Sequence, residues 1–225
     1  MTVDAGAFVL DGTSGDAAML GGKGAALDRL IGWGLTVPTT GVVPASVYRL
    51  LVGMPAVEDL LGRVRAGDPV PAEEVDAVFA AQDLPPTLTD RVVSVAAEVA
   101  EGRTLAVRSS ATVEDLDQLS FAGQYRSLLD IDPEDPEILL RSVKLVWASL
   151  WHPAPHSYRS TLGVDDRDIA MAVVLMRMVP ARHAGVVFTV DPGGTAGAAR
   201  IEAVEGLAES LVSGDRTPEA FVADR

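Results

Sequence analysis

The spacing of apolar and polar positions changes repeatedly along the chain between helical and extended patterns. Helical spacing over residues 24–33 places Ala26, Leu27, Leu30 and Ile31 on one face. The same spacing predicts helices at 44–51, 71–81, 87–101 and 136–150. Apolar extended runs predict strands at 37–43, 105–108, 124–131, 168–179, 184–190, 200–204 and 220–222. This mixture predicts an α/β or α+β fold in which helices cover sheets.

Length and composition set the class of protein. The chain has 225 residues, of which 48% are hydrophobic and 22% charged, so it suits one large domain or two modest lobes and excludes general disorder. The longest wholly apolar stretch, residues 169–176, is far too short to cross a membrane. The amino-terminus shows no secretory signal, so we expect a cytoplasmic protein.

Charge and cysteine content narrow the chemistry further. The net charge of −14 disfavours partners that are themselves anionic, so we expect neither nucleic acid nor membrane as a ligand. The chain has no cysteine, which excludes disulfides, thiol nucleophiles and cysteine-based zinc sites. A phosphate-bearing small ligand is not excluded by this charge, but it would need a local cluster of basic side chains or a metal ion.

The segment Leu20-Gly-Gly-Lys-Gly-Ala-Ala-Leu27 places three glycines and Lys23 before a helical pattern. Glycines allow backbone N–H groups to approach a phosphate, and a helix amino-terminus favours negative charge. Two known phosphate templates fail, because Ala17 and Gly24 break the P-loop pattern and Leu27 breaks the dinucleotide fingerprint. A purely structural turn is therefore the alternative to phosphate binding.

A second basic candidate follows a buried strand. Arg108 stands at the predicted end of the strand at 105–108, where ligands bind in open sheets, and Ser109 and Ser110 follow it. The hydroxyl groups suit either phosphate oxygens or the capping of the next turn. Residues 113–124 are acidic and then rich in small residues, which fits either a solvated loop or a flap over a ligand.

The histidines carry little functional signal. His152 and His156 are four residues apart, but Pro153 and Pro155 are expected to break any helix that would align them. No metal site is therefore expected there, and His183 is expected in an exposed turn.

Several ordered segments together resemble a known family. In chain order they are Gly21-Gly-Lys-Gly-Ala-Ala-Leu27, Leu35-Thr-Val-Pro38, Val107-Arg-Ser-Ser-Ala-Thr-Val-Glu-Asp-Leu116, Ser120-Phe-Ala-Gly-Gln124, Trp147-Ala-Ser-Leu-Trp151, Gly185-Val-Val-Phe-Thr189 and Gly206-Leu-Ala-Glu-Ser-Leu-Val-Ser-Gly214. This set resembles the amino-terminal ATP-binding domain of the pyruvate phosphate dikinase and phosphoenolpyruvate synthase family, which rifampicin phosphotransferase also carries. The resemblance extends over nearly the whole chain.

The resemblance implies an ATP-grasp-like domain that holds ATP and Mg²⁺ between two lobes. Residues 1–178 would form the first lobe, and residues 179–225 the hinge and an incomplete start of the second. In such families ATP gives its β-phosphate to a histidine on a separate swivelling domain, which leaves AMP and a second phosphate. The implied function is thus the ATP-binding part of a dikinase-type phosphotransferase, a kinase activity that needs a histidine carrier domain.

Individual positions are implied by the same resemblance. Lys23 and Arg108 match phosphate-binding cations, and Gly123 lies in a flap over the phosphates. Ser127 stands where relatives often carry a phosphate-contacting threonine. Met178 and Val179 match the strand that leads into the hinge, whose backbone meets the adenine.

Departures from the family pattern leave the enzyme activity open. Met176 replaces a frequent glutamine, and the acidic metal motif, the Gln-x-Arg motif and the carrier histidine have no counterpart. We therefore expect no metal ligand and no complete catalytic set here, with the missing lobe and the carrier histidine as partners on another chain. The alternatives are a non-catalytic nucleotide- or partner-binding module and an inactive remnant of the domain.

Overall fold

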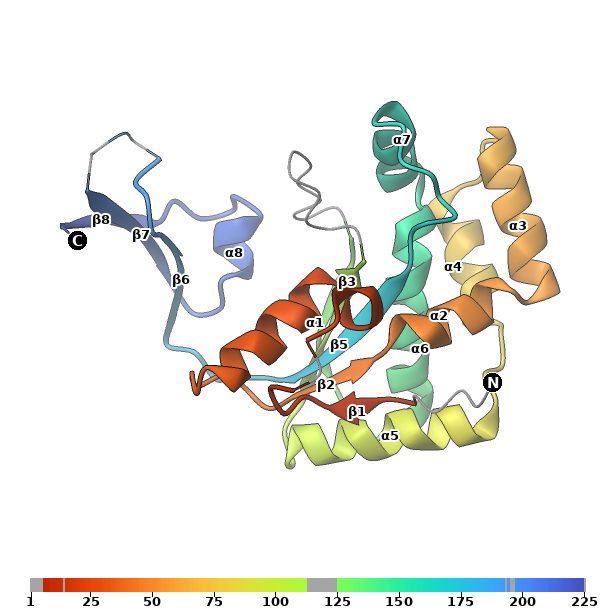
Figure 1. Cartoon of the computed structure of the whole chain (residues 1–225), viewed down its shortest axis with the longest axis horizontal. Coiled ribbons are helices and arrows are strands. Elements are labelled where there is room, and N and C mark those ends of the chain that lie inside the picture. Colours follow the sequence, from red (N-terminus) through yellow and green to blue (C-terminus); the bar gives the residue numbers. More distant parts are fainter. Residues whose placement is uncertain (1–5, 14, 113–124, 193, 195–196, 225) are drawn as a thin grey trace. The chain divides into compact units, whose positions relative to one another are not determined.

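The computed structural model describes residues 6–13, 15–112, 125–192, 194 and 197–224. The chain divides into two compact units, Met1–Met178 and Val179–Arg225. Figure 1 shows the elements of both units.

A five-stranded antiparallel sheet organises the first unit. Its spatial order is β1-β2-β5-β3-β4. The strands are β1 Phe8–Val9, β2 Thr40–Val43, β3 Leu105–Ala111, β4 Ser127–Ile131 and β5 Met171–Arg177. The central strand β5 is buried over its first five residues, as its apolar run predicts. The other predicted strands of this unit are confirmed with shifted ends, whereas the two-residue β1 was not predicted.

Seven helices among the described residues surround this sheet. They are α1 Ala17–Gly32, α2 Ala45–Val52, α3 Pro55–Ala66, α4 Ala72–Ala80, α5 Pro86–Ala100, α6 Pro136–Ala148 and α7 Pro153–Thr161, with the 3₁₀ turn η1 Ser149–Trp151 after α6. The predicted helices at 44–51, 71–81, 87–101 and 136–150 are confirmed within a few residues. The sequence pattern did not predict α3 and α7.

The prediction that prolines prevent a helix at 153–156 is wrong. Pro153 opens α7 at its first position, and Pro155 falls within the first turn. Backbone N–H groups in a first helical turn have no partner inside the helix, so prolines there remove no hydrogen bond.

The two faces of the sheet receive different helices. A Cβ atom on Gly41 of β2 would come within 2.6 Å of Val95 Cγ1, so α5 packs tightly on that face. The next residue, Val42, faces the opposite way and lies beside Gly24 of α1. Helix α1 therefore covers the face that carries Val42, and Figure 1 shows it crossing in front of β3 and β5.

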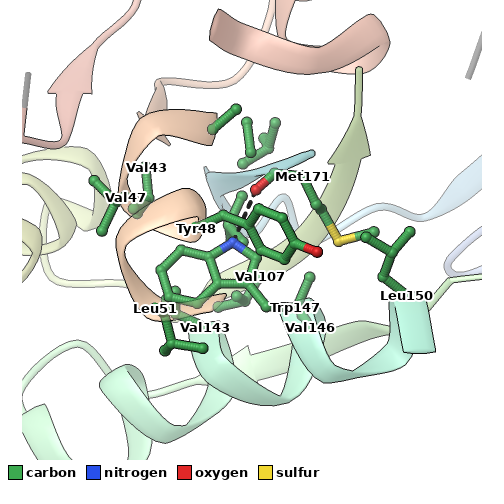
Figure 2. Packing of buried hydrophobic residues seen from close by; sticks show 14 of the residues in the cluster. Val43, Val47, Tyr48, Leu51, Val107, Val143, Val146, Trp147, Leu150 and Met171 are labelled. Atoms are coloured by element: carbon green, nitrogen blue, oxygen red, sulfur yellow. Dashed lines mark hydrogen bonds between the residues drawn. The ribbon is translucent and has the colours of Figure 1, made fainter. Parts of the chain in front are cut away.

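The core of the first unit is built around Trp147. This side chain is fully buried, and its Nε1–H donates to the Met171 backbone oxygen at 2.9 Å. Its ring meets the Tyr48 ring edge-on, with centroids 6.3 Å apart. Figure 2 shows both side chains in the core. Trp151 Nε1–H donates to the Tyr48 hydroxyl at 2.8 Å. These aromatic contacts join α2, α6 and η1 to the central strand.

The second unit is a three-stranded antiparallel sheet with a short helix. The strands are β6 His183–Phe188, β7 Ala198–Glu205 and β8 Glu219–Asp224, in that spatial order, and the helix is α8 Glu209–Val212. The three strands confirm the predictions for this part of the chain. Helices and two antiparallel sheets place the protein in the α+β class. Among the described residues no helix is long and apolar enough to cross a membrane.

Candidate functional site

Helix α1 contains a break at Gly21. The residue has φ 70° and ψ 173°, a conformation that essentially only glycine adopts. The expectation of a glycine-rich turn that precedes a helix at residue 24 is therefore corrected. The helix begins at Ala17, and the glycine segment lies inside it, at the junction of two helical stretches.

The hydroxyl group of Ser110 fills this break. Ser110 Oγ accepts a hydrogen bond from the Gly24 N–H at 3.0 Å and donates one to the Leu20 carbonyl at 2.7 Å. In an uninterrupted helix the Gly24 N–H would donate directly to the Leu20 carbonyl. A side chain of β3 is thus inserted into the hydrogen-bond ladder of α1.

Two of the glycines permit this close approach. A Cβ atom on Gly21 would lie 2.0 Å from the Ser110 backbone oxygen, and one on Gly24 would lie 3.0 Å from Leu20 Cβ. Packing therefore accounts for Gly21 and Gly24 without a ligand. The phosphate hypothesis for this segment has to rest on Lys23 and its surroundings.

Arg108 lies on the same sheet face as Ser110. The strand β3 continues to Ala111, so the prediction that Arg108 ends a strand is wrong; it occupies the middle of β3. Residues two apart on a strand share a face and are separated by roughly 7 Å. Arg108 is half-buried, whereas the other six residues of β3 are buried. Among the ion pairs between described residues, none involves Arg108.

Ser127 lies directly across from Arg108. The pairing of β3 with β4 places the two residues opposite each other, and Ser127 is exposed. Directly opposed side chains in antiparallel strands have Cβ atoms about 5 Å apart on one face. The structure therefore brings together two residues that the resemblance selected, one with a guanidinium group and one with a hydroxyl group.

Lys23 is carried by the part of α1 attached to this face. It lies between Gly22 and Gly24, two residues after the break, and it is half-buried. Because Gly24 is hydrogen-bonded to Ser110, the backbone of Lys23 is fixed next to β3. The sequence indicated both cations but not the Ser110 contact that positions one relative to the other.

The remaining predicted positions lie farther along the chain. Met178 follows β5, and its N–H donates to the Thr104 oxygen at 2.9 Å. It stands four residues beyond Val174, the residue opposite Arg108, or about 13 Å along the strand. Met178 ends the first unit and Val179 begins the second. Gly123 lies outside the described residues.

The described residues on either side of 113–124 are anchored in the first unit. Thr112 N–H donates to the Ala170 oxygen at 2.9 Å, extending the pairing of β3 with β5. Arg126 N–H donates to Ser149 Oγ at 3.1 Å, and its guanidinium donates to Asp76 at 2.9 Å. The sequence pattern did not predict the Asp76 ion pair, because its partners are 50 residues apart.

The histidines of the first unit pair with carboxylates. His152 Nε2 lies 2.8 Å from Asp76, and His156 Nε2 lies 3.1 Å from Asp166. Asp166 also accepts from the buried Arg159. Among the described residues no group of three histidine or acidic side chains could hold a metal ion.

A cavity of about 660 Å³ lies elsewhere in the first unit, between the end of α3 and α7. Val64, Val70, Trp151 and His156 are among its lining residues. None of the predicted site residues lines it, so we place the candidate site on the sheet face that carries Arg108 rather than in this cavity.

Comparison with known proteins supports the resemblance. Residues 17–225 match the family described as "Pyruvate phosphate dikinase, AMP/ATP-binding domain". The chain is 35% identical over 222 residues to a phosphoenolpyruvate synthase of Aeropyrum pernix, an alignment that covers 92% of this chain and 27% of that protein.

Two further relatives have different names. A rifampicin phosphotransferase of Streptomyces sviceus is 36% identical over 91% of this chain and 24% of its own length. A prodigiosin synthesizing transferase of Serratia marcescens is 36% identical over 94% of this chain and 23% of its own length. The chain thus spans about a quarter of the length of these curated relatives. It belongs to the pyruvate phosphate dikinase AMP/ATP-binding domain family.

Proposed function

We propose that this chain binds ATP as the nucleotide-binding domain of a dikinase-type phosphotransferase. The triphosphate lies against the face of the first-unit sheet that carries Arg108, with Lys23 and Arg108 as its cations and Ser127 as a hydroxyl donor. The phosphoryl group then passes to a histidine on a separate carrier domain.

One observation supports this proposal above the others. The Ser110 hydroxyl attaches the Lys23 segment of α1 to β3, two residues from Arg108 and on the same face. Two cations 85 residues apart in sequence are therefore carried by segments that meet on one face of the sheet. Such an arrangement suits a ligand with several neighbouring negative charges.

The chemistry of this site is electrostatic. Phosphoryl transfer asks the protein mainly to position the phosphates and to neutralise charge that develops on their oxygens. The guanidinium of Arg108 donates in a fork that matches two phosphate oxygens, whereas the ammonium group of Lys23 acts as a mobile point charge. The Ser127 hydroxyl donates a further hydrogen bond. The resemblance alone implies Mg²⁺ as a further partner of the phosphates.

The finer assignments belong to the same proposal. The resemblance supports three of them. These are an ATP-grasp-like fold, two lobes to which residues 1–178 and 179–225 belong, and an adenine contact at the backbone of Met178 and Val179. The three relatives named above all align with this domain, yet their names describe different reactions. We therefore propose that the final acceptor is selected outside this domain.

The test is the affinity for ATP, measured by isothermal titration calorimetry. Lys23→Ala and Arg108→Ala should each weaken binding roughly tenfold to a hundredfold, because a charge-assisted contact contributes about 1.5–3 kcal/mol. Arg29→Ala, on the exposed part of α1, and Arg103→Ala, in the exposed turn before β3, are the matched controls. Each removes one positive charge from the same region of sequence.

The controls separate site contacts from net charge. We expect affinities within twofold of the unmodified protein for both control variants. Equal losses of ATP affinity in the control and site variants would show that the effect comes from net charge and not from contacts at the site. Unchanged affinity in both Lys23→Ala and Arg108→Ala would contradict the phosphate assignment, and undetectable ATP binding by the unmodified chain would contradict the proposed function itself.

A further inference from the structure

We propose that Ser110 is a positioning residue of the nucleotide site, because its hydroxyl group keeps α1 broken at Gly21 and thereby sets the direction of Lys23. The effect of Ser110 on ATP binding rests on the proposed function. The effect of Ser110 on the conformation of α1 does not.

The hydrogen bonds of Ser110 replace one bond of the helix. The groups that it contacts, the Gly24 N–H and the Leu20 carbonyl, are the donor and acceptor that would pair in a continuous helix. A hydroxyl group supplies one donor and also accepts, so a single side chain satisfies both groups. Leu20 and Ser110 are both completely buried, so water does not compete for these bonds.

Removal of the hydroxyl group leaves the helix two outcomes. The Gly24 N–H and Leu20 carbonyl either stay unpaired in a buried environment, which is unfavourable, or they pair with each other. Direct pairing requires Gly21 to leave φ 70° for helical dihedral angles near −63° and −42°. The stretch before Gly21 and the stretch that carries Lys23 would then rotate relative to each other.

The second outcome affects the candidate site directly. Gly24 would lose its attachment to β3, and the Lys23 side chain would no longer be fixed relative to Arg108. The backbone N–H groups that follow Gly21 would also enter ordinary helical hydrogen bonds, as in any helix interior. Both changes remove favourable interactions with a phosphate without touching either cation. The role of Ser110 is thus conformational.

The experiment compares Ser110→Ala with Ser109→Ala. Ser109 is the neighbouring residue on β3, is nearly as buried as Ser110 at 2% exposed, and faces the opposite side of the sheet. Titration calorimetry with ATP should give about a tenfold loss of affinity for Ser110→Ala and less than a twofold change for Ser109→Ala. Urea unfolding of both variants verifies that each is folded at the temperature of the titration.

A third variant and a second measurement complete the test. Ser110→Cys replaces the hydroxyl group with a somewhat larger thiol that forms only weak hydrogen bonds, so it should lose affinity as Ser110→Ala does. It replaces Ser110→Ala if that variant does not fold. In NMR spectra recorded without nucleotide, the Gly21 carbonyl and Cα shifts of either variant should move towards helical values, whereas Ser109→Ala should leave them unchanged.

The outcomes separate the two proposals. If the unmodified chain does not bind ATP, the proposed function fails, and the Gly21 shifts still test the role of Ser110 in the helix. If ATP binds and depends on Lys23 and Arg108, yet folded Ser110→Ala and Ser110→Cys retain full affinity, the positioning role is overturned. Unchanged Gly21 shifts in both variants would overturn the conformational role of the hydroxyl group.

Discussion

The close contact between α1 and β3 makes Gly21→Ala a demanding test of the structure. Gly21 has φ 70° and ψ 173°, where a residue with a side chain is unfavourable by about 1–3 kcal/mol. Its added Cβ atom would also lie 2.0 Å from the Ser110 backbone oxygen and 2.3 Å from Ser110 Oγ. The first of these atoms belongs to the backbone of a buried strand and has little freedom to move.

The two contributions give the expected loss of stability. Overpacking of a well-packed site typically costs about 1–3 kcal/mol. Added to the backbone contribution, this predicts that Gly21→Ala lowers the free energy of unfolding by roughly 2–6 kcal/mol. If the helix instead relaxes to a continuous form, the Ser110 hydrogen bonds are lost, and ATP affinity should fall with stability.

Gly34→Ala is the matched control for this variant. Gly34 also has positive φ, at 74°, but a Cβ atom there would meet nothing within 4 Å. It should therefore show only the backbone contribution of about 1–3 kcal/mol. Urea unfolding followed by tryptophan fluorescence is the assay, since Trp33, Trp147 and Trp151 all report on the first unit. A Gly21→Ala loss no larger than that of Gly34→Ala would refute the packing described here.

Two further predictions concern the core. Tyr48→Phe removes the acceptor for Trp151 Nε1–H and should destabilise the protein by about 1–3 kcal/mol in urea unfolding. Burial raises the pKa of the Tyr48 phenol above its ordinary value of 10.0, so stability should fall as the pH rises above 10, and less steeply in Tyr48→Phe. An equal alkaline loss in both proteins would contradict this. Leu139 is fully buried on α6, so Leu139→Ala should lower the free energy of unfolding by about 2–5 kcal/mol. Ile138 is 47% exposed, so Ile138→Ala should lower it far less. Similar losses in the two variants would contradict the assignment of Leu139 to the buried face of α6.

Local patterns predicted most of the fold because the elements concerned are amphipathic or apolar over their full length. The helix α5, with Val92, Val95 and Val99 inward, and the strand β5 are examples. The helix α7 was missed because Pro153 and Pro155 suggested a bend, although both lie in its first turn. The predicted end of β3 at Arg108 came too early because the two serines that follow are typical of a loop. Both serines are in fact buried in the strand.

The candidate site was predictable residue by residue but not as an arrangement. Lys23 and Arg108 could be singled out from their neighbours and from the family resemblance. The contact that relates them, from Ser110 to Leu20, joins residues 90 apart in sequence. No local pattern signals such a contact, because neither a serine in a strand nor a glycine in a helix indicates which distant residue it will meet.

The central claim is that nucleotide binds on the sheet face that carries Arg108, and a residue-resolved NMR titration with ATP and Mg²⁺ tests it most directly. We predict the largest saturable amide shifts at Gly22 to Gly24, Arg108 and Ser127, and further saturable shifts at Met178 and Val179, whose backbone is proposed to contact the adenine. We predict no saturable shifts along α7, which borders the separate cavity near Trp151. Saturable shifts confined to α7 and its cavity, with the Arg108 face unaffected, would contradict the claim.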